Sequence, residues 1–381
     1  MVATVFLRVP VARNSLDGLN GIVVALQQAT QAGTEFLFGY VGTTENLPFK
    51  ASEQESVGFF VFAFQALPLL VFVSALAAVL WHWGILKWII RGFALVIARL
   101  LGSGGAVSLA ASANVLLGQT EAPLLIRAYL ATVTRSELFA IIACGYATVA
   151  GTVMALYAFL LNPLDPSMLG HILVASIISV PAALLLAQIM VPPAPGDHVT
   201  AADDAEDGFS YEGTLDAFCV GAAEGGKLWA NIVVAILAFI ALAALVNIML
   251  DNFVPDVMGA PLTLERILGW GFAPLVWLAG IPAEQMVTAG ELMGIKTALN
   301  EVIAYSALVG LEDGALDQRS TLIMVYALCG FANVGSLGIV IGGLSALEPE
   351  RRHEIVSLAP RGLIAGTLGT LMSGAVVGVV Y

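Results

Sequence analysis

Long apolar runs separated by short polar stretches dominate the chain. A helix needs about 20 apolar residues to cross a bilayer, and this pattern predicts spans at 59–83, 138–160, 169–191, 228–250, 321–347 and 355–381. Residues 15–38 alternate apolar and polar positions as an amphipathic helix does. We expect two further helices, 85–101 and 262–281, to lie at the membrane surface. Together these elements predict an all-α polytopic membrane protein.

One polar stretch, Gly118-Gln119-Thr120-Glu121-Ala122-Pro123, interrupts otherwise apolar sequence. A carboxylate at Glu121 would cost several kcal/mol in lipid unless it faces a cavity, a ligand or a partner. Pro123 has no amide hydrogen for a helix, and Gly118 relaxes the backbone on the other side. We therefore expect two short helical arms joined by an open tip over residues 103–131. The alternative is a soluble core helix that ends at a proline.

Basic residues in short loops set the predicted orientation, since they gather on the cytoplasmic side. The basic residues at 87–99 and at 127–135 both stay inside only if 103–131 enters and returns as a re-entrant hairpin. The same counting places the acidic linker and the loop at 344–361 inside. It makes 283–311 a second hairpin that enters from outside, and it leaves the C-terminus outside.

Two nine-residue segments, 143–151 and 328–336, match in their cysteine, glycine, alanine and valine positions. Each follows an irregular segment, and the predicted topology runs them in opposite directions. We divide the chain into an N-terminal part (1–57: the end of a truncated span, the amphipathic helix and a loop), a first repeat (58–191), an acidic linker (192–227) and a second repeat (228–381). Inverted repeats with broken transmembrane helices and re-entrant hairpins are typical of secondary transporters. Chance similarity of two Gly/Ala-rich helices is the alternative.

The composition also indicates a polytopic membrane protein. The 381 residues are 59% hydrophobic and 11% charged, with a mean hydropathy of +0.91, whereas soluble domains are about 25% charged. A net charge of −13 leaves no basic footprint for nucleic acid. The three cysteines fit neither a zinc site nor a disulfide framework, so we expect no cofactor.

The chain resembles the concentrative nucleoside transporter family, in its bacterial branch of sodium/nucleoside symporters. The resemblance covers nearly the whole chain. It rests on residues 118–123 (GQTEAP), 136–140 (SELFA), 300–301 with 304–305 (NE and AY), 329–333 (CGFAN), 32–39 (AGTEFLFG) and 365–368 (AGTL).

This resemblance implies a homotrimer in a cell inner (plasma) membrane that imports a nucleoside such as uridine, with sodium as the coupling ion and elevator-type alternating access. It also implies three groups of site residues, none of them catalytic. The nucleobase would contact Gln119, Thr120, Glu121 and Val153; the ribose would contact Glu301, Phe331, Asn333 and Ser336; and sodium would bind Asn114, Leu117, Thr148 and Val149.

Other readings remain open at this stage. Some members of the family couple to protons, although Asn114 and Thr148 argue for sodium. A membrane protein that senses or gates on nucleoside without transport is a second alternative. An intramembrane enzyme is disfavoured, because no histidine, serine or metal cluster accompanies the two carboxylates. For each carboxylate, a buried structural role is also possible.

Overall fold

The structure is a computed structural model that describes residues 10–43, 60–119, 121–165, 167–197, 200, 210–257, 259 and 261–381. The side chains of residues 10–20, 22 and 23 lie outside this description, as do Thr120 and most of the loop expected at 42–57. The described chain is almost entirely helical, and within it five helices are long and apolar enough to cross a membrane. The predicted all-α fold of a multi-pass membrane protein is confirmed.

The N-terminal part contains α2 (Pro10–Phe38), and the first repeat begins with α3 (Phe62–Gln65), α4 (Leu69–His82) and α5 (Ile85–Leu101). The span predicted at 59–83 breaks before α4, because Pro68 cannot continue the hydrogen-bond ladder of α3. Gly84 and Gly102 adopt left-handed conformations and bound α5 on both sides. The helix predicted at 85–101 therefore has the expected bounds, and its place at the membrane surface stays a prediction.

The first repeat continues with one hairpin, one broken span and one continuous helix. The hairpin comprises α6 (Gly105–Leu116) and the 3-10 helix η2 (Ala122–Tyr129). The span splits into α7 (Arg135–Ala147) and α8 (Gly151–Leu161), and α9 (Met168–Met190) follows. A capping box starts α7, where Glu137 and the Thr134 hydroxyl satisfy each other's backbone amides.

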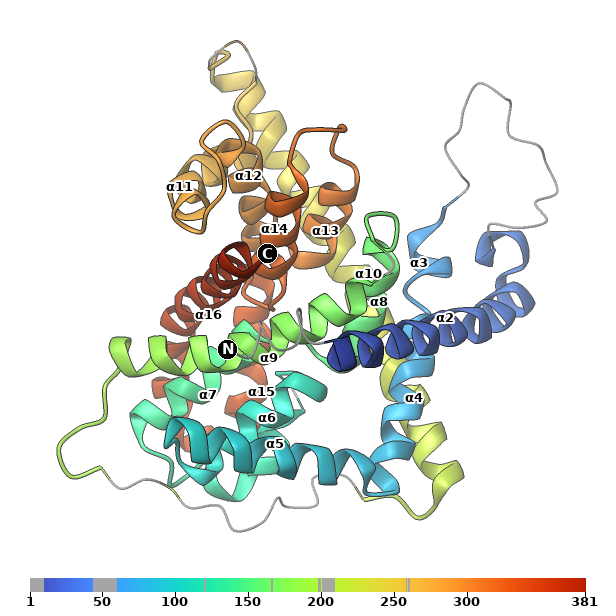
Figure 1. Cartoon of the computed structure of the whole chain (residues 1–381), viewed down its shortest axis with the longest axis vertical. Helices are drawn as coiled ribbons and strands as arrows, with labels where there is room; N and C mark the ends of the chain where they lie inside the picture. Colours follow the sequence, from blue (N-terminus) through green and yellow to red (C-terminus); the bar gives the residue numbers. More distant parts are fainter. Residues whose placement is uncertain are drawn as a thin grey trace.

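The second repeat has the same order of elements. After α10 (Thr214–Phe253) and α11 (Leu264–Leu278), the second hairpin is α12 (Met286–Ala298) and α13 (Glu301–Val309). The broken span is α14 (Gln318–Leu328) and α15 (Val334–Leu347), and α16 (Arg352–Val380) ends the chain. In Figure 1, α5 and α6 lie at one end of the long axis, and α11 and α12 lie at the other. This arrangement supports the predicted inversion.

The expected linker at 192–227 is shorter than predicted, because α10 begins at Thr214. Residues 214–227 look polar, but they pack tightly on α4. A Cβ built on Gly221 would lie 2.6 Å from the Ala78 Cβ, and one on Gly225 would lie 2.7 Å from the Val71 Cα. This close packing extends the helix beyond the apolar run that defined the predicted span at 228–250.

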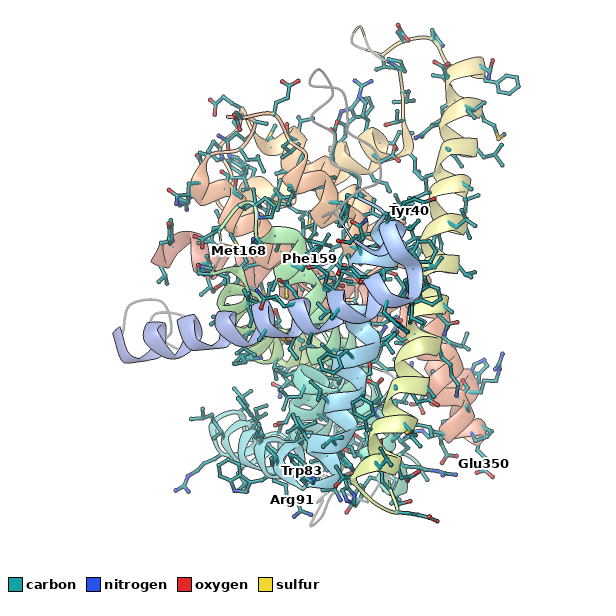
Figure 2. The ribbon with its side chains drawn as sticks, turned by 90° about the vertical axis from the view of Figure 1, so that its right-hand side faces the viewer. Tyr40, Trp83, Arg91, Phe159, Met168 and Glu350 are labelled. Atoms are coloured by element: carbon teal, nitrogen blue, oxygen red, sulfur yellow. The ribbon has the colours of Figure 1, made fainter. Side chains whose placement is uncertain are left out.

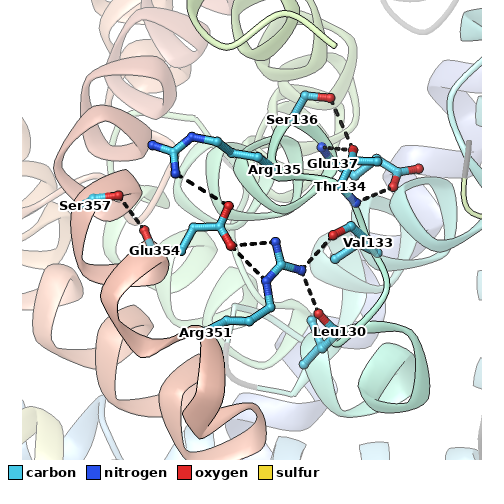
Figure 3. A network of polar contacts seen from close by, with 9 residues as sticks. All are labelled: Leu130, Val133, Thr134, Arg135, Ser136, Glu137, Arg351, Glu354 and Ser357. Atoms are coloured by element: carbon cyan, nitrogen blue, oxygen red, sulfur yellow. Dashed lines mark hydrogen bonds and ion pairs between the residues drawn. The ribbon is translucent and has the colours of Figure 1, made fainter. Parts of the chain in front are cut away.

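Helix α16 joins the two repeats, since it packs on α7 and α9 of the first and on α14 of the second. Gly362 and Gly366 allow this approach, because a Cβ on Gly366 would collide with the Tyr146 Cβ in α7. Arg351 precedes α16 and donates hydrogen bonds to the carbonyls of Leu130 (2.8 Å) and Val133 (2.7 Å), just after the first hairpin (Figure 3). The last helix is thereby fixed to the exit of that hairpin.

Two charged surface residues lie at one end of the molecule. Arg91 of α5 and Glu350, beside the loop at 344–361, lie toward the same end of the molecule in Figure 2. Met168, at the start of α9, lies away from that end. The orientation of these ends relative to a membrane stays a prediction.

Candidate functional site

The tip of the second hairpin presents a buried carboxylate. Asn300 ends the extended tip and caps α13, because its Oδ1 accepts from the Ile303 amide at 3.0 Å. Glu301, the next residue, is only 4% exposed. It lies in the first turn of α13, where the helix dipole favours a negative charge.

Two donors from other elements hold this carboxylate. The Tyr157 hydroxyl of α8 donates to Glu301 Oε1 at 2.7 Å, and Asn333 Nδ2 donates to Oε2 at 2.9 Å. Asn333 itself caps α15, since its Oδ1 accepts from the Ser336 amide at 2.8 Å. The structure therefore unites Glu301, Asn333 and Ser336, which were all assigned to ribose, around one point where three helices meet.

Tyr157 is a residue of the candidate site that the sequence analysis did not name. It is fully buried, and it reaches Glu301 from a position 144 residues away in the chain. The available signal was its spacing: Tyr157 lies four residues after Val153, and residues four apart share one helix face. Val153 is also buried, so one face of α8 carries both side chains.

The tip of the first hairpin packs against the start of α8. Gly118 has a positive φ of 105°, and a Cβ there would lie 2.7 Å from the Ala150 Cβ and 3.2 Å from Glu121 Oε2. A Cβ on Gly151 would lie 2.7 Å from the Leu116 carbonyl oxygen. From Gly151 to Tyr157 a helix rises about 9 Å, so both hairpin tips meet α8 within that length.

The predicted nucleobase residues of this tip are only partly described. Glu121 precedes η2 and its side chain makes no capping bond to that helix. Gln119 packs against Gly145 of α7, and its Oε1 is buried without a hydrogen-bond partner among the described residues. A buried, unpaired acceptor costs free energy unless a ligand or water satisfies it, and so Gln119 is poised to bind a donor. Thr120 lies outside the described residues.

The predicted ion ligands gather where the first hairpin meets the break between α7 and α8. The Asn114 Oδ1 is buried without a partner in the described chain and faces Gly145 of α7. Thr148 is 1% exposed at the C-cap of α7, and its hydroxyl donates to the Cys144 carbonyl at 2.8 Å, which leaves its lone pairs available. Leu117 caps α6 and Val149 lies between α7 and α8, so neither carbonyl belongs to a helix interior.

The two broken spans meet at their interruptions. The Phe331 amide donates to the Thr148 carbonyl at 3.4 Å, and a Cβ on Gly330 would lie 2.9 Å from the Tyr146 carbonyl oxygen. This contact brings Phe331, assigned to ribose, next to the ion ligands. The residues assigned to ribose and those assigned to sodium thus lie on either side of the point where the two broken spans meet.

The comparisons with known proteins agree with this architecture. A family profile described as the C-terminus of Na+ dependent nucleoside transporters matches residues 171–378, and one described as nucleoside recognition matches residues 63–164. The nucleoside permease NupC of Helicobacter pylori is 35% identical over 377 residues, which cover 98% of this chain and 87% of that protein. The chain belongs to the concentrative nucleoside transporter family.

Other relatives of this nucleoside transporter family member include human solute carrier family 28 member 3. It is 35% identical over 96% of this chain, which spans about half of that protein (52%). Among solved structures, CNTnw in an inward-facing substrate-bound state superposes with a TM-score of 0.86 at 35% identity, covering 100% of this chain and 90% of the other. A substituted CNTnw in an outward-facing state gives 0.87 at 34% identity, covering 100% and 88%.

Members of this family are transporters rather than enzymes, as the sequence indicated. Within the described residues, no group of three or more His, Cys, Asp or Glu side chains is placed to hold a metal ion. The neutral oxygens near Asn114 and Thr148 remain the candidate ion ligands of this transporter. The roles assigned to individual site residues stay predictions.

Proposed function

We propose that this transporter imports nucleosides such as uridine across the inner membrane by sodium symport. The observation that carries the proposal is the juxtaposition of two chemistries around α8. On one side lies a buried carboxylate, Glu301, held by Tyr157 and Asn333. On the other side lies a group of neutral oxygens that includes the unpaired Asn114 Oδ1.

The carboxylate suits a ribose. The Glu301 carboxylate accepts hydrogen bonds from Tyr157, Asn333 and its own backbone amide, and a carboxylate offers about four lone-pair sites in total. A ribose hydroxyl can therefore donate to Glu301 without displacing Tyr157 or Asn333. The nucleobase edge would pair with Gln119, Thr120 and Glu121 of the first hairpin tip. Val153, on α8 between the two tips, would pack on the face of the nucleobase.

The oxygens near the break suit sodium, a hard cation that unwound helices coordinate through carbonyls in secondary transporters. The group contains no carboxylate, so a proton finds no strong acceptor there, which favours sodium over proton coupling. An ion bound by Asn114 and Thr148 would hold the first hairpin against α7 and so order the tip. Since coupling free energies are reciprocal, sodium and nucleoside should each tighten the binding of the other.

We further propose that the protein works as a homotrimer with elevator-type movement, with the acidic linker cytoplasmic and the C-terminus outside. The close packing of the first hairpin tip on α8, the contact of α13 with α8, and the packing of α16 on α7, α9 and α14 support movement of these elements as one body. In the most apolar 18-residue window of α10, only 6% of the residues are buried. This exposed apolar helix supports contact with lipid or with other subunits.

Uptake of radiolabelled uridine into proteoliposomes, with sodium, potassium or choline outside, tests the proposal. We expect accumulation only in sodium, and the Asn114→Ala, Thr148→Ala double variant should lose this preference. Ser112→Ala is the matched control, because Ser112 lies on the same arm but bonds to the Ser108 carbonyl. Equal uptake in all three salts, driven instead by a pH gradient, would establish proton coupling. Uridine binding without uptake would establish a sensing protein.

Glu121→Gln and Glu301→Gln test the substrate site by calorimetry. Hydrogen bonds to charged groups contribute about 1.5–3 kcal/mol, and 1.4 kcal/mol is tenfold in affinity. Each variant should therefore bind uridine at least tenfold more weakly, whereas the exposed Glu350→Gln should not differ. Unchanged affinity in both site variants would reject the assignment.

A further inference from the structure

A cavity lies apart from the proposed transport site, where α2, the segment from Phe60 to α4, and α8 meet. Its volume is about 530 Å³, which is in the range of sites for small molecules. Five uncharged polar side chains line it: Gln27, Thr30, Gln31, Thr43 and Gln65. Amides and hydroxyls in otherwise apolar surroundings cost free energy unless they are hydrogen-bonded, so their concentration here calls for a role.

Hydrogen bonds hold one wall of this cavity in place. Gln65 Nε2 donates to the carbonyls of Val41 (3.1 Å) and Thr43 (3.0 Å), which lie in and just after the 3-10 helix η1 (Gly39–Gly42). The Thr34 hydroxyl of α2 donates to the Gly42 carbonyl at 2.8 Å, and a Cβ on Gly42 would collide with the Thr34 backbone. Because η1 is thus folded tightly onto α2, the cavity is formed before a ligand arrives, which lowers the cost of ordering on binding.

The polar side chains of α2 leave acceptors for a ligand. Gln31 Nε2 donates to Thr43 Oγ1 at 3.4 Å and to Glu35 Oε1 at 3.0 Å, and the Thr30 hydroxyl donates to the Leu26 carbonyl at 2.8 Å. These donors are therefore used within the protein, whereas Gln31 Oε1 and the lone pairs of Thr30 Oγ1 can still accept. A ligand that carries several hydroxyl or N–H donors suits this arrangement.

Two aromatic rings complete the lining. Phe60 and Phe159 stack on each other, with ring centroids 6.0 Å apart and an angle of 28° between the planes. A planar ring system can extend such a stack. None of the described lining residues is charged, so a phosphate or an ammonium group would find no counter-charge there. A neutral ligand with a planar ring and several donors fits best, and a nucleoside has all three properties.

The cavity lies on the predicted route of import. Phe159 is six residues after Val153 on α8, which is about 9 Å along the helix. In Figure 2, Phe159 and Met168 lie on the side of the molecule away from Arg91. The loop-charge argument predicts that the end with Arg91 is cytoplasmic, so the cavity would lie toward the outside of the transport site.

We propose that this cavity is a second, peripheral nucleoside site, which an imported molecule occupies before it reaches the hairpin tips. The inference rests on the proposed uptake of nucleosides. It requires that nucleoside binds in the cavity independently of Glu121 and Glu301.

Protection of an introduced thiol tests the site in the purified intact protein. Thr30→Cys places the thiol in the cavity, and Cys219→Ser removes the exposed native cysteine, while Cys144 and Cys329 are buried. We expect uridine to slow the reaction of Thr30→Cys with a water-soluble maleimide, whereas sucrose should not. Thr132→Cys, at an exposed position outside the cavity, is the matched control and should react equally with and without uridine.

Further substitutions separate this site from the hairpin tips. Adding Glu121→Gln with Glu301→Gln should leave the half-protecting uridine concentration at Thr30→Cys unchanged. Phe159→Leu should raise that concentration about tenfold, because stacking on an aromatic ring contributes strongly to the binding of a base. Phe36→Leu, at an 89% exposed ring outside the cavity, should not change it. If Phe159→Leu does not yield folded protein, Phe60→Leu removes the other ring of the stack.

Three results would overturn the inference: no protection by uridine, equal protection by sucrose, or a half-protecting concentration that rises with the loss of Glu121 and Glu301. In the last case the protection would come from the transport site through a change of conformation. Uptake of uridine without protection of Thr30→Cys would refute the peripheral site alone. Absence of uptake by the unmutated protein would instead refute the proposed function, so the two failures are distinguishable.

Discussion

Substitution of Gly118 by alanine should separate the first hairpin tip from α8. At φ 105°, a non-glycine residue pays about 1–2 kcal/mol for a left-handed backbone. The new Cβ would also lie 2.7 Å from the Ala150 Cβ, a distance that real Cβ atoms do not tolerate, and such overpacking costs about 1–3 kcal/mol. The expected total is about 2–5 kcal/mol, which the tip can relieve only by moving away from Ala150.

Such a movement would displace Glu121 and the Leu117 carbonyl together. We therefore expect Gly118→Ala to weaken uridine binding at least tenfold in calorimetry and to reduce the stabilisation by sodium in thermal unfolding. Gly196→Ala is the matched control: its φ is 95°, but its new Cβ would have no atom within 4 Å. If Gly118→Ala binds uridine and sodium as the control does, the tip does not depend on its contact with α8, and the reasoning is wrong.

Three further predictions concern single side chains. Tyr157→Phe should weaken uridine binding about tenfold, because Glu301 loses a donor; Tyr146→Phe, which removes a buried hydroxyl without a partner in the described residues, should bind as the unmutated protein does. Arg351→Ala should lower the thermal unfolding temperature more than Arg352→Ala, since only Arg351 holds the carbonyls of Leu130 and Val133. Hydrogen bonding from the Ser320 amide lowers the pKa of Asp317, which caps α14. The stability contributed by this cap is present above the unfolded pKa and is lost as pH falls through the lower, folded pKa. Asp317→Asn should flatten this part of a Tm-against-pH profile.

Helix positions followed from the sequence where the signal is local. The hydrophobic runs predicted the positions of α4 and α5 within a few residues, and Pro68, Gly84 and Gly102 set their breaks and ends in the structure. The start of α10 at Thr214 could not be predicted in this way, because it depends on the packing of Gly221 and Gly225 against α4. That contact is distant in sequence and leaves no periodic apolar signal.

The site residues show the same division. Glu121 and Glu301 stand out because a carboxylate in an apolar run is costly. Tyr157 does not stand out, since a tyrosine in an apolar helix is ordinary and its role arises only where α8 meets α13.

The docking of α16 on the first repeat has a consequence for biosynthesis. Tyr146 packs closely against Gly362 and Gly366, so the core around α7 stays incomplete until the last helix is made. About 200 residues separate the two helices, and at 5–20 residues per second the ribosome needs roughly 10–40 s to add them. During that interval the newly inserted first repeat presents an open seam to the bilayer or to an insertion chaperone. A chain that stops before α16 would keep that seam, and the cell's quality-control proteases could recognise it.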